Sequence, residues 1–187
     1  MTPTLDHLFA AHCAPALAGV KPANVVSCRT ADHPDLEGQL EHYRRAFACR
    51  GVSFRSRSAC AGRALILVYR PKLLAEQLGQ PSVAQALASF GYEDTAPLEE
   101  QLDRLSGRIA AGGGFPHELG LFLGYPAEDV LGFVAHAGQG YKLSGPWKVY
   151  GDVEAAKRTF DRIARVSRTL TRYVEGGSSL FRLFSVA

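Results

Sequence analysis

The sequence predicts a single α/β domain of mixed, α+β-like class, with one sheet of about five strands covered by helices. The chain has 187 residues, and a length of roughly 150 corresponds to one domain, so we expect residues 1–187 to form one. Hydrophobic residues make up 47% of the chain and charged residues 21%, as in globular domains. Segments with helical spacing alternate with short apolar segments, which favours a sheet interleaved with helices.

Helices are indicated by the spacing of apolar residues and by residues typical of helix ends. In the first helix Leu5, Phe9 and Cys13 lie on one face, and Pro15 ends this helix near Ala14. Proline at a first helical position, acidic residues in a first turn and an aspartate N-cap mark later helix starts. The further predicted helices are 35–49, 71–79, 82–90, 97–111, 126–138 and 152–175.

Strands are indicated by short segments that alternate in polarity or are apolar throughout. Residues 64–69 and the run within 118–123 are apolar at nearly every position, as strands covered on both faces are, so we expect them at the centre of the sheet. The segment 58–62 joins two strands as a hairpin, which excludes a purely parallel sheet. The predicted strands are 24–29, 52–57, 64–69, 118–123 and 147–150.

Apolar run length and charge bear on location and partners. The longest apolar runs are far shorter than the ~20 residues that cross a bilayer, and the N-terminus lacks the cationic start of a signal peptide. We therefore expect a cytoplasmic protein without a membrane partner. The net charge of +3 is too small to indicate nucleic acid as a partner, so nucleic acid binding is not expected.

The cysteine spacing predicts neither a metal site nor a disulfide framework. No two of Cys13, Cys28, Cys49 and Cys60 form the CxxC pair that zinc ribbons and redox dithiols need. Without an export signal a disulfide framework is not expected either. Each cysteine is therefore interpreted first as a small buried hydrophobic residue, and no metal ligand is assigned.

Common catalytic and nucleotide-binding motifs are absent. The segment from Gly138 has Leu143 where a dinucleotide fingerprint needs its third glycine, and it follows a predicted helix. His117-Glu118 lacks the second histidine of a zincin motif, and neither GxxxxGK[ST] nor GxSxG occurs. The residues by themselves therefore name no reaction, cofactor or oligomeric state.

Three blocks of sequence resemble one bacterial family. They are FPHELGLFLGYPAEDVLGFVAHAGQGYKLSGPWKVYGDVEAAKRTF at 115–160, HCAPALAGVKPANVVS at 12–27 and VYRPKLL at 68–74. Together they resemble the family catalogued as domain of unknown function 3793 over essentially the whole chain. The resemblance implies a small cytoplasmic bacterial protein with no established activity, in a redox or metal context. Many members carry a further cysteine near the position of Arg165, and its absence here argues against a role built on a cysteine pair.

The leading functional hypothesis is a protein that binds a small ligand, or one linked to redox or metal chemistry. The segment 140–148 offers aromatic faces and cations to an anionic, planar ligand. The turn 124–129 lies between a predicted strand and a helix, where ligands bind in α/β sheets. The alternative is an ordered loop anchored by a core tryptophan. The candidate ligand-binding residues are Tyr125, Tyr141, Lys142, Trp147 and Lys148.

A second hypothesis is a thiol-dependent hydrolase or transferase. Cys13 lies beside His12 near a helix end, where a cation or the helix dipole lowers a thiol pKa. His117 is the candidate base, so the catalytic candidates are Cys13 and His117. The alternative is that Cys13 is a core residue.

A third hypothesis is a regulatory or interaction protein that uses its last long helix. Five arginines recur there every three or four residues and form a basic stripe that could contact phosphates. Acid-before-base pairs, Glu154–Arg158 and Asp161–Arg165, are expected to neutralise this face, which favours a solvated surface. The stripe consists of Arg158, Arg162, Arg165, Arg168 and Arg172.

Overall fold

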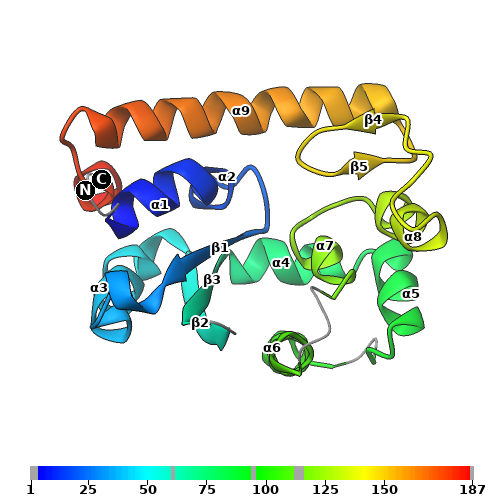
Figure 1. Cartoon of the computed structure of the whole chain (residues 1–187), viewed down its shortest axis with the longest axis horizontal. Helices are drawn as coiled ribbons and strands as arrows, with labels where there is room; N and C mark the ends of the chain where they lie inside the picture. Colours follow the sequence, from blue (N-terminus) through cyan, green and yellow to red (C-terminus); the bar gives the residue numbers. More distant parts are fainter. Residues whose placement is uncertain (1–3, 60–61, 94–95, 112–115, 186–187) are drawn as a thin grey trace. The chain divides into compact units, whose positions relative to one another are not determined.

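The chain forms two compact units. Unit 1 consists of residues 1–72 and 163–187, and unit 2 consists of residues 73–162. The long helix α9 (Val153–Glu175) contributes its first part to unit 2 and its second part to unit 1. The prediction of a single domain remains a prediction. The computed structural model, drawn in Figure 1, describes residues 4–59, 62–93, 96–111 and 116–185.

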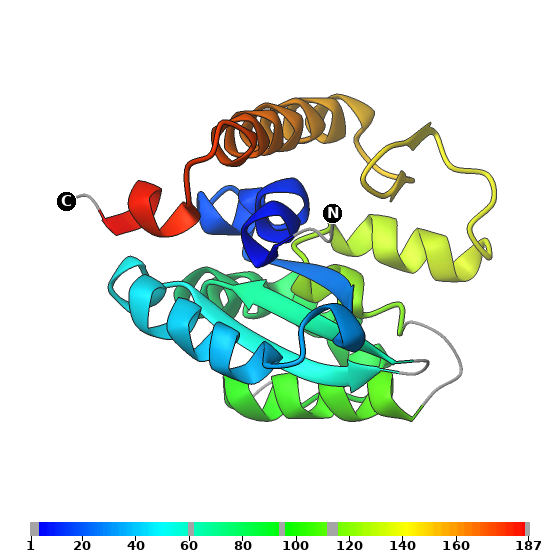
Figure 2. The same ribbon diagram turned by 60° about the vertical axis from the view of Figure 1, so that its left-hand side comes forward.

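Unit 1 contains a three-stranded antiparallel sheet with α1 and α2 on one of its faces (Figure 2). β3 lies between β1 and β2, and in this register Ile66 stands opposite Val26 on one side and Ser56 on the other. The strand predictions for this part of the chain are confirmed, and 64–69 is a central strand as expected. The strands are β1 (Ala23–Arg29), β2 (Ser53–Ala59) and β3 (Arg63–Tyr69).

Helices cover one face of this sheet and form an aromatic core with it. Because side chains alternate along a strand, Val26, Phe54 and Ile66 point to the same face, where they join one buried cluster. Phe9 and Phe47 each approach the ring of Phe54, with centroid distances of 5.3 and 5.7 Å. The helical segments are α1 (Leu5–His12), α2 (Ala14–Leu17), η1 (Thr30–Asp32), α3 (Leu36–Phe47), η2 (Ala48–Arg50) and α10 (Leu180–Ser185).

Unit 2 is mostly helical. The helices predicted at 71–79, 82–90, 97–111 and 126–138 are present with ends within a few residues of the predicted ones. Two short strands pair antiparallel as a hairpin. The elements are α4 (Pro71–Leu78), which starts in unit 1, α5 (Pro81–Ser89), α6 (Leu98–Ala110), α7 (Leu119–Phe122), α8 (Ala127–Ala135), β4 (Leu143–Ser144) and β5 (Lys148–Val149).

The prediction of a central strand at 118–123 is wrong, because this segment forms the short helix α7. A short apolar run cannot distinguish a buried strand from a buried helix, and every residue of α7 is buried. Gly120 contributes to this packing, since a Cβ there would lie 2.9 Å from both Tyr125 and Val130. The single five-stranded sheet is therefore also wrong: the described residues form a sheet of three strands and one of two. The mixed α+β class holds.

The last long helix is confirmed. The Asp152 carboxylate accepts a hydrogen bond from the Ala155 backbone N–H at 3.0 Å, which caps α9 as expected. The short helix α10 was not predicted. Among the described residues, no helix has both the length and the hydropathy that crossing a membrane requires.

Candidate functional site

Asp6 connects three helices of unit 1. The Thr4 hydroxyl accepts from the His7 backbone N–H at the start of α1, and this cap places Asp6 in the first turn. One carboxylate oxygen of Asp6 accepts from the Tyr43 hydroxyl of α3 at 2.5 Å. The other accepts from the backbone N–H of Leu180, at the start of α10, at 3.1 Å. Asp6 therefore holds α3 and α10 against α1.

Three rings beside Asp6 form an aromatic wall. Tyr43 and Phe181 lie with ring centroids 4.5 Å apart, and the His42 ring meets Phe181 edge-on at 5.0 Å. Burial, together with the hydrogen bond to Asp6, raises the pKa of Tyr43 well above its ordinary value. Its hydroxyl therefore stays protonated and remains a hydrogen-bond donor near neutral pH.

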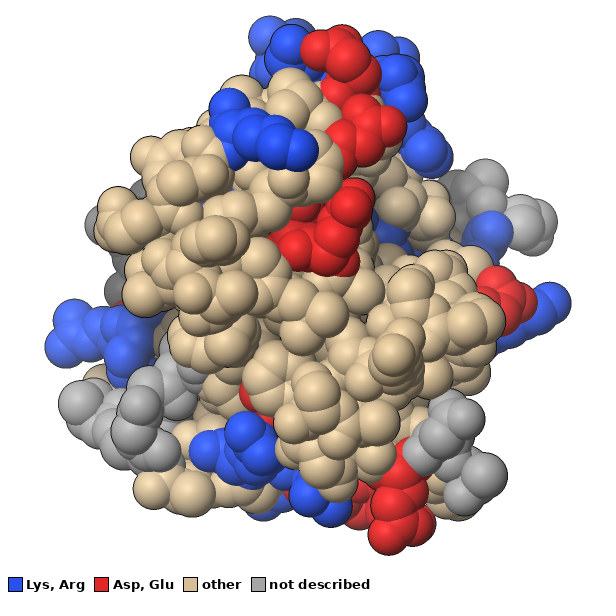
Figure 3. All heavy atoms as spheres, turned by 90° about the vertical axis from the view of Figure 1, so that its right-hand side faces the viewer, with Lys and Arg blue, Asp and Glu red and all other residues tan. Residues whose placement is uncertain are grey.

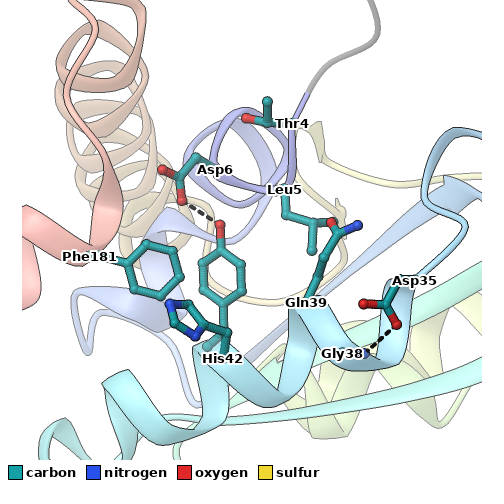
Figure 4. Close-up of a pocket in the computed structure, with 9 residues that line it drawn as sticks. Thr4, Leu5, Asp6, Asp35, Gly38, Gln39, His42 and Phe181 are labelled. Atoms are coloured by element: carbon teal, nitrogen blue, oxygen red, sulfur yellow. Dashed lines mark hydrogen bonds between the residues drawn. The ribbon is translucent and has the colours of Figure 1, made fainter.

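These side chains line a groove of about 480 Å³ between α1, α3 and α10 (Figure 4). On its opposite wall Asp35 caps α3, where its carboxylate accepts from the Gly38 backbone N–H at 3.2 Å. A Cβ on Gly38 would clash with the Asp35 carboxylate, so a larger residue at position 38 would displace this side chain. The side chains that matter for recognition are Asp6, Asp35, Gln39, His42, Tyr43 and Phe181.

The groove presents hydrogen-bond acceptors and aromatic surface. Asp6 and Asp35 each supply a carboxylate, and none of the residues that line the groove is a lysine or an arginine. Its volume falls within the ~300–1,000 Å³ typical of small-ligand sites. Within the part of the chain that the structure describes, His, Cys, Asp and Glu side chains form no group of three able to hold a metal ion. The two carboxylates and the rings of the groove can accept hydrogen bonds and contact apolar groups.

The two catalytic candidates lie in different units. Cys13, between α1 and α2 in unit 1, is fully buried, and burial raises the pKa of its thiol although the Lys21 ammonium opposes this. Lys21 is itself buried, which lowers its pKa to about 8. His117 belongs to unit 2, where its exposed ring lies 5.3 Å from that of Phe133. This environment is that of a core thiol, and the catalytic role of Cys13 remains a prediction.

Alkylation of the folded protein distinguishes the two roles of Cys13. We expect iodoacetamide at pH 7 to label the exposed Cys49 at least about tenfold faster than the buried Cys13, because attack needs an accessible thiolate. Peptide mass spectrometry after timed quenching measures both rates, and unfolding in urea should equalise them. Labelling of Cys13 at the rate of Cys49 would instead support the thiol enzyme. Cys60, the control that the sequence suggests, lies outside the described residues.

The aromatic residues predicted to bind a ligand pack against each other in unit 2. Tyr125 stacks on Trp147 with ring centroids 4.7 Å apart, and Phe160 meets the other side of the indole edge-on at 4.6 Å. The indole N–H donates to the buried Asp129 carboxylate at 2.7 Å. This arrangement anchors the hairpin through a core tryptophan, the alternative raised by the sequence.

The cations of the same segment bind backbone carbonyls. The Lys142 ammonium donates to the Gly151 carbonyl at 3.0 Å, and the Lys148 ammonium donates to the Gly138 carbonyl at 2.6 Å. Lys148 also lies 4.8 Å from the ring centroid of the exposed Tyr141. In the described segment 140–148, the exposed Tyr141 and the half-buried Lys148 thus bring an aromatic face and a cation together.

Several large hydrophobic side chains of unit 2 are exposed. They are Leu131 and Val134 of α8 and Tyr141 beside the β4–β5 hairpin. In the view of Figure 3, uncharged side chains cover broad areas, and acidic side chains lie between them.

Sequence reasoning missed the groove because its residues are far apart in the chain. Asp6 stands alone as an acid within an apolar segment, and Phe181 lies on α10, which the sequence analysis does not predict. The available signal is an acidic residue beside an apolar helical face, followed by an aspartate N-cap before a second amphipathic helix. This signal does not reveal that the two helices contact each other.

The described residues thus form an α+β fold whose first unit holds an acidic, aromatic groove. The sequence matches the family described as "Protein of unknown function (DUF3793)" over residues 9–184, and the chain belongs to that family. The resemblance seen in the three sequence blocks is thereby confirmed. No curated protein and no solved structure matches the chain.

Proposed function

We propose that this protein binds a small organic cation, such as an amine with an aromatic or apolar part, in the groove of unit 1. The observation that carries the proposal is the pair of carboxylates, Asp6 and Asp35, on the walls of a 480 Å³ groove without lysine or arginine. A protonated amine would donate to these carboxylates, and hydrogen bonds between charged groups are stronger than neutral ones. The rings of Tyr43 and Phe181 would contact the apolar part of the ligand.

Asp35→Asn tests this proposal with little effect on folding. Asparagine caps helices as well as aspartate does, so α3 should keep its N-cap while the groove loses one negative charge. We expect phenethylamine to bind the variant about fivefold to tenfold more weakly, or about 1 kcal/mol, because the carboxylate is exposed and its charge partly screened. Isothermal titration calorimetry or chemical shift changes of groove residues measure the affinity.

The matched control is Asp32→Asn, which removes the same charge from the same unit at a residue outside the groove. This variant should bind phenethylamine as the parent protein does. Phenethyl alcohol, which lacks the cation, should bind weakly, with the same affinity for the parent protein and for the Asp35→Asn variant. Equal affinities of the Asp35→Asn variant and the parent protein for phenethylamine would contradict the proposal.

The segment 140–148 is the second candidate for a small-ligand site, in line with the sequence hypothesis. Its support is the surface pair of Tyr141 and Lys148, which suits an anionic, planar ligand. The internal hydrogen bonds of Lys142 and Lys148 weigh against it, because a ligand would have to replace them. Shift changes confined to Tyr141 on addition of an aromatic carboxylate such as benzoate would favour this site over the groove.

A further inference from the structure

The charge of the chain is divided unequally between its two units. Unit 1 contains fourteen Lys and Arg against six Asp and Glu, a formal charge of +8. Unit 2 contains seven against twelve, a formal charge of −5, and the two values sum to the +3 of the whole chain. The net charge of +3, which gave no indication of a nucleic acid partner, is thus the sum of a strongly basic unit and an acidic one. Twelve of the fourteen cations in unit 1 are arginines.

Three of these arginines form a row on the part of α9 that belongs to unit 1. Arg165, Arg168 and Arg172 are spaced by three and four residues, so they share one face of the helix, and all three are exposed. On the other side of α9, Leu170 and Val174 are buried in the core of unit 1. The row therefore has a fixed backbone and points to solvent.

The predicted neutralising pairs are not formed. Glu154 pairs with Lys157 at 2.8 Å rather than with Arg158. Among the described residues no carboxylate forms an ion pair with Arg165, Arg168 or Arg172. From residue 163 to residue 174 the helix contains no aspartate or glutamate. In the described part of the chain, these three neighbouring guanidinium groups thus form no ion pair, although Asp161 and Glu175 flank the row in sequence.

We propose that the row Arg165–Arg168–Arg172 binds the phosphate backbone of a nucleic acid duplex. At 1.5 Å per residue the row spans about 10 Å along the helix, while successive phosphates of one strand advance by about 3.4 Å along the duplex axis. Each guanidinium can therefore contact a different phosphate, and arginine does so with two parallel hydrogen bonds. Such contacts to the backbone carry affinity but no sequence preference.

The surroundings of the row favour a duplex over other polyanions. No large hydrophobic residue described on α9 is strongly exposed, whereas protein interfaces depend on apolar or aromatic anchors. The apolar side of α9 is already used in the core of unit 1, so it is not available to enter a lipid surface. The row has fixed spacing on a rigid helix, which suits the regular phosphates of a duplex.

The test compares two triple variants with equal loss of charge. One replaces Arg165, Arg168 and Arg172 with glutamine, which is also a good helix former. The control replaces Arg29, Arg45 and Arg57, exposed arginines of unit 1 that lie outside α9, with glutamine. Fluorescence anisotropy with a labelled 20-base-pair duplex DNA of mixed sequence gives the affinity between 25 and 200 mM salt. Circular dichroism confirms that each variant is folded.

We expect the parent protein to bind with a slope of log K against log salt of about −3, since each neutralised phosphate contributes about −0.9. The α9 variant should lose at least about tenfold in affinity at 50 mM salt and most of this slope. The control should stay within about threefold of the parent protein. Three results would each overturn the proposal. The first is an equal loss of affinity in both variants, and the second is no binding of the duplex at 25 mM salt. The third is that the parent protein binds polyglutamate or phosphatidylserine vesicles as tightly as it binds the duplex. These readouts do not involve the groove, so failure of the small-ligand proposal leaves this one standing.

Discussion

Replacing Arg70 with methionine should lower the free energy of unfolding by about 3 kcal/mol, because one guanidinium satisfies three backbone carbonyls. Arg70 follows β3 and donates to the carbonyls of Ala16 at 2.7 Å, Leu17 at 2.5 Å and Arg50 at 2.9 Å. These acceptors belong to α2 and η2, so the side chain holds two helical ends against the end of a strand. Methionine fills a similar volume but offers no donor.

Local geometry makes the Arg70 contact possible. Gly19 has a φ of +72°, which glycine adopts without strain, and this turn follows α2 directly. A Cβ on Gly19 would lie 3.4 Å from Nε of Arg70, which is close to an ordinary van der Waals contact, so the positive φ is the reason for glycine there. The turn at Gly19 thus lies against the Arg70 side chain, although the two residues are far apart in the sequence.

Thermal unfolding measures the effect of Arg70→Met. A loss of about 3 kcal/mol corresponds to a decrease in Tm of about 6–12 °C for a chain of this length. Arg63→Met is the matched control, since among the described residues the exposed Arg63 donates hydrogen bonds only to Ser27, and its Tm should change by no more than about 2 °C. Arg70→Lys should recover part of the loss. A Tm of Arg70→Met equal to that of the control would show that the three carbonyls are satisfied in another way.

Asp129→Asn should destabilise unit 2 by a similar amount, about 3 kcal/mol. The buried carboxylate accepts three hydrogen bonds, from the Trp147 indole at 2.7 Å and from the backbone N–H groups of Tyr150 and Gly151 at 2.7 and 2.9 Å. An asparagine has one acceptor oxygen, so its amide N–H₂ would face at least one of these donors. A buried donor left without an acceptor then costs about 1–3 kcal/mol.

Tryptophan fluorescence reports this change directly, because Trp147 is the only tryptophan of the chain. We expect the Asp129→Asn variant to emit at longer wavelength and to unfold at lower denaturant concentration when followed by this signal. Glu128→Gln is the control, since it removes the charge of the neighbouring exposed residue and should change the midpoint little. An unchanged midpoint and spectrum for Asp129→Asn would mean that the hairpin is held by ring packing alone.

Much of the secondary structure could be predicted from the sequence because its signals are local. Pro71 and Asp152 mark the starts of helices that the structure contains, and the apolar run at 64–69 is the central strand β3. The apolar run inside 118–123 misled the prediction, since burial on all sides makes a helix and a strand look alike in sequence. The importance of Asp129 could not be predicted, as an acidic residue in the first turn of a helix is usually exposed and favoured by the dipole.

The sequence by itself determined the α+β class, most of the helices, the three strands of unit 1 and the membership of the family. The class and the elements follow from side-chain spacing, caps and turn residues, which act within a few residues of the chain, whereas the family follows from the match over residues 9–184. The tertiary structure alone decided that Asp6, Tyr43 and Phe181 meet in one groove, that Cys13 is buried, and that Arg165, Arg168 and Arg172 form no ion pair with any described carboxylate. These features depend on contacts between residues far apart in the chain, or on which of several nearby cations a carboxylate pairs with. No local sequence pattern encodes either.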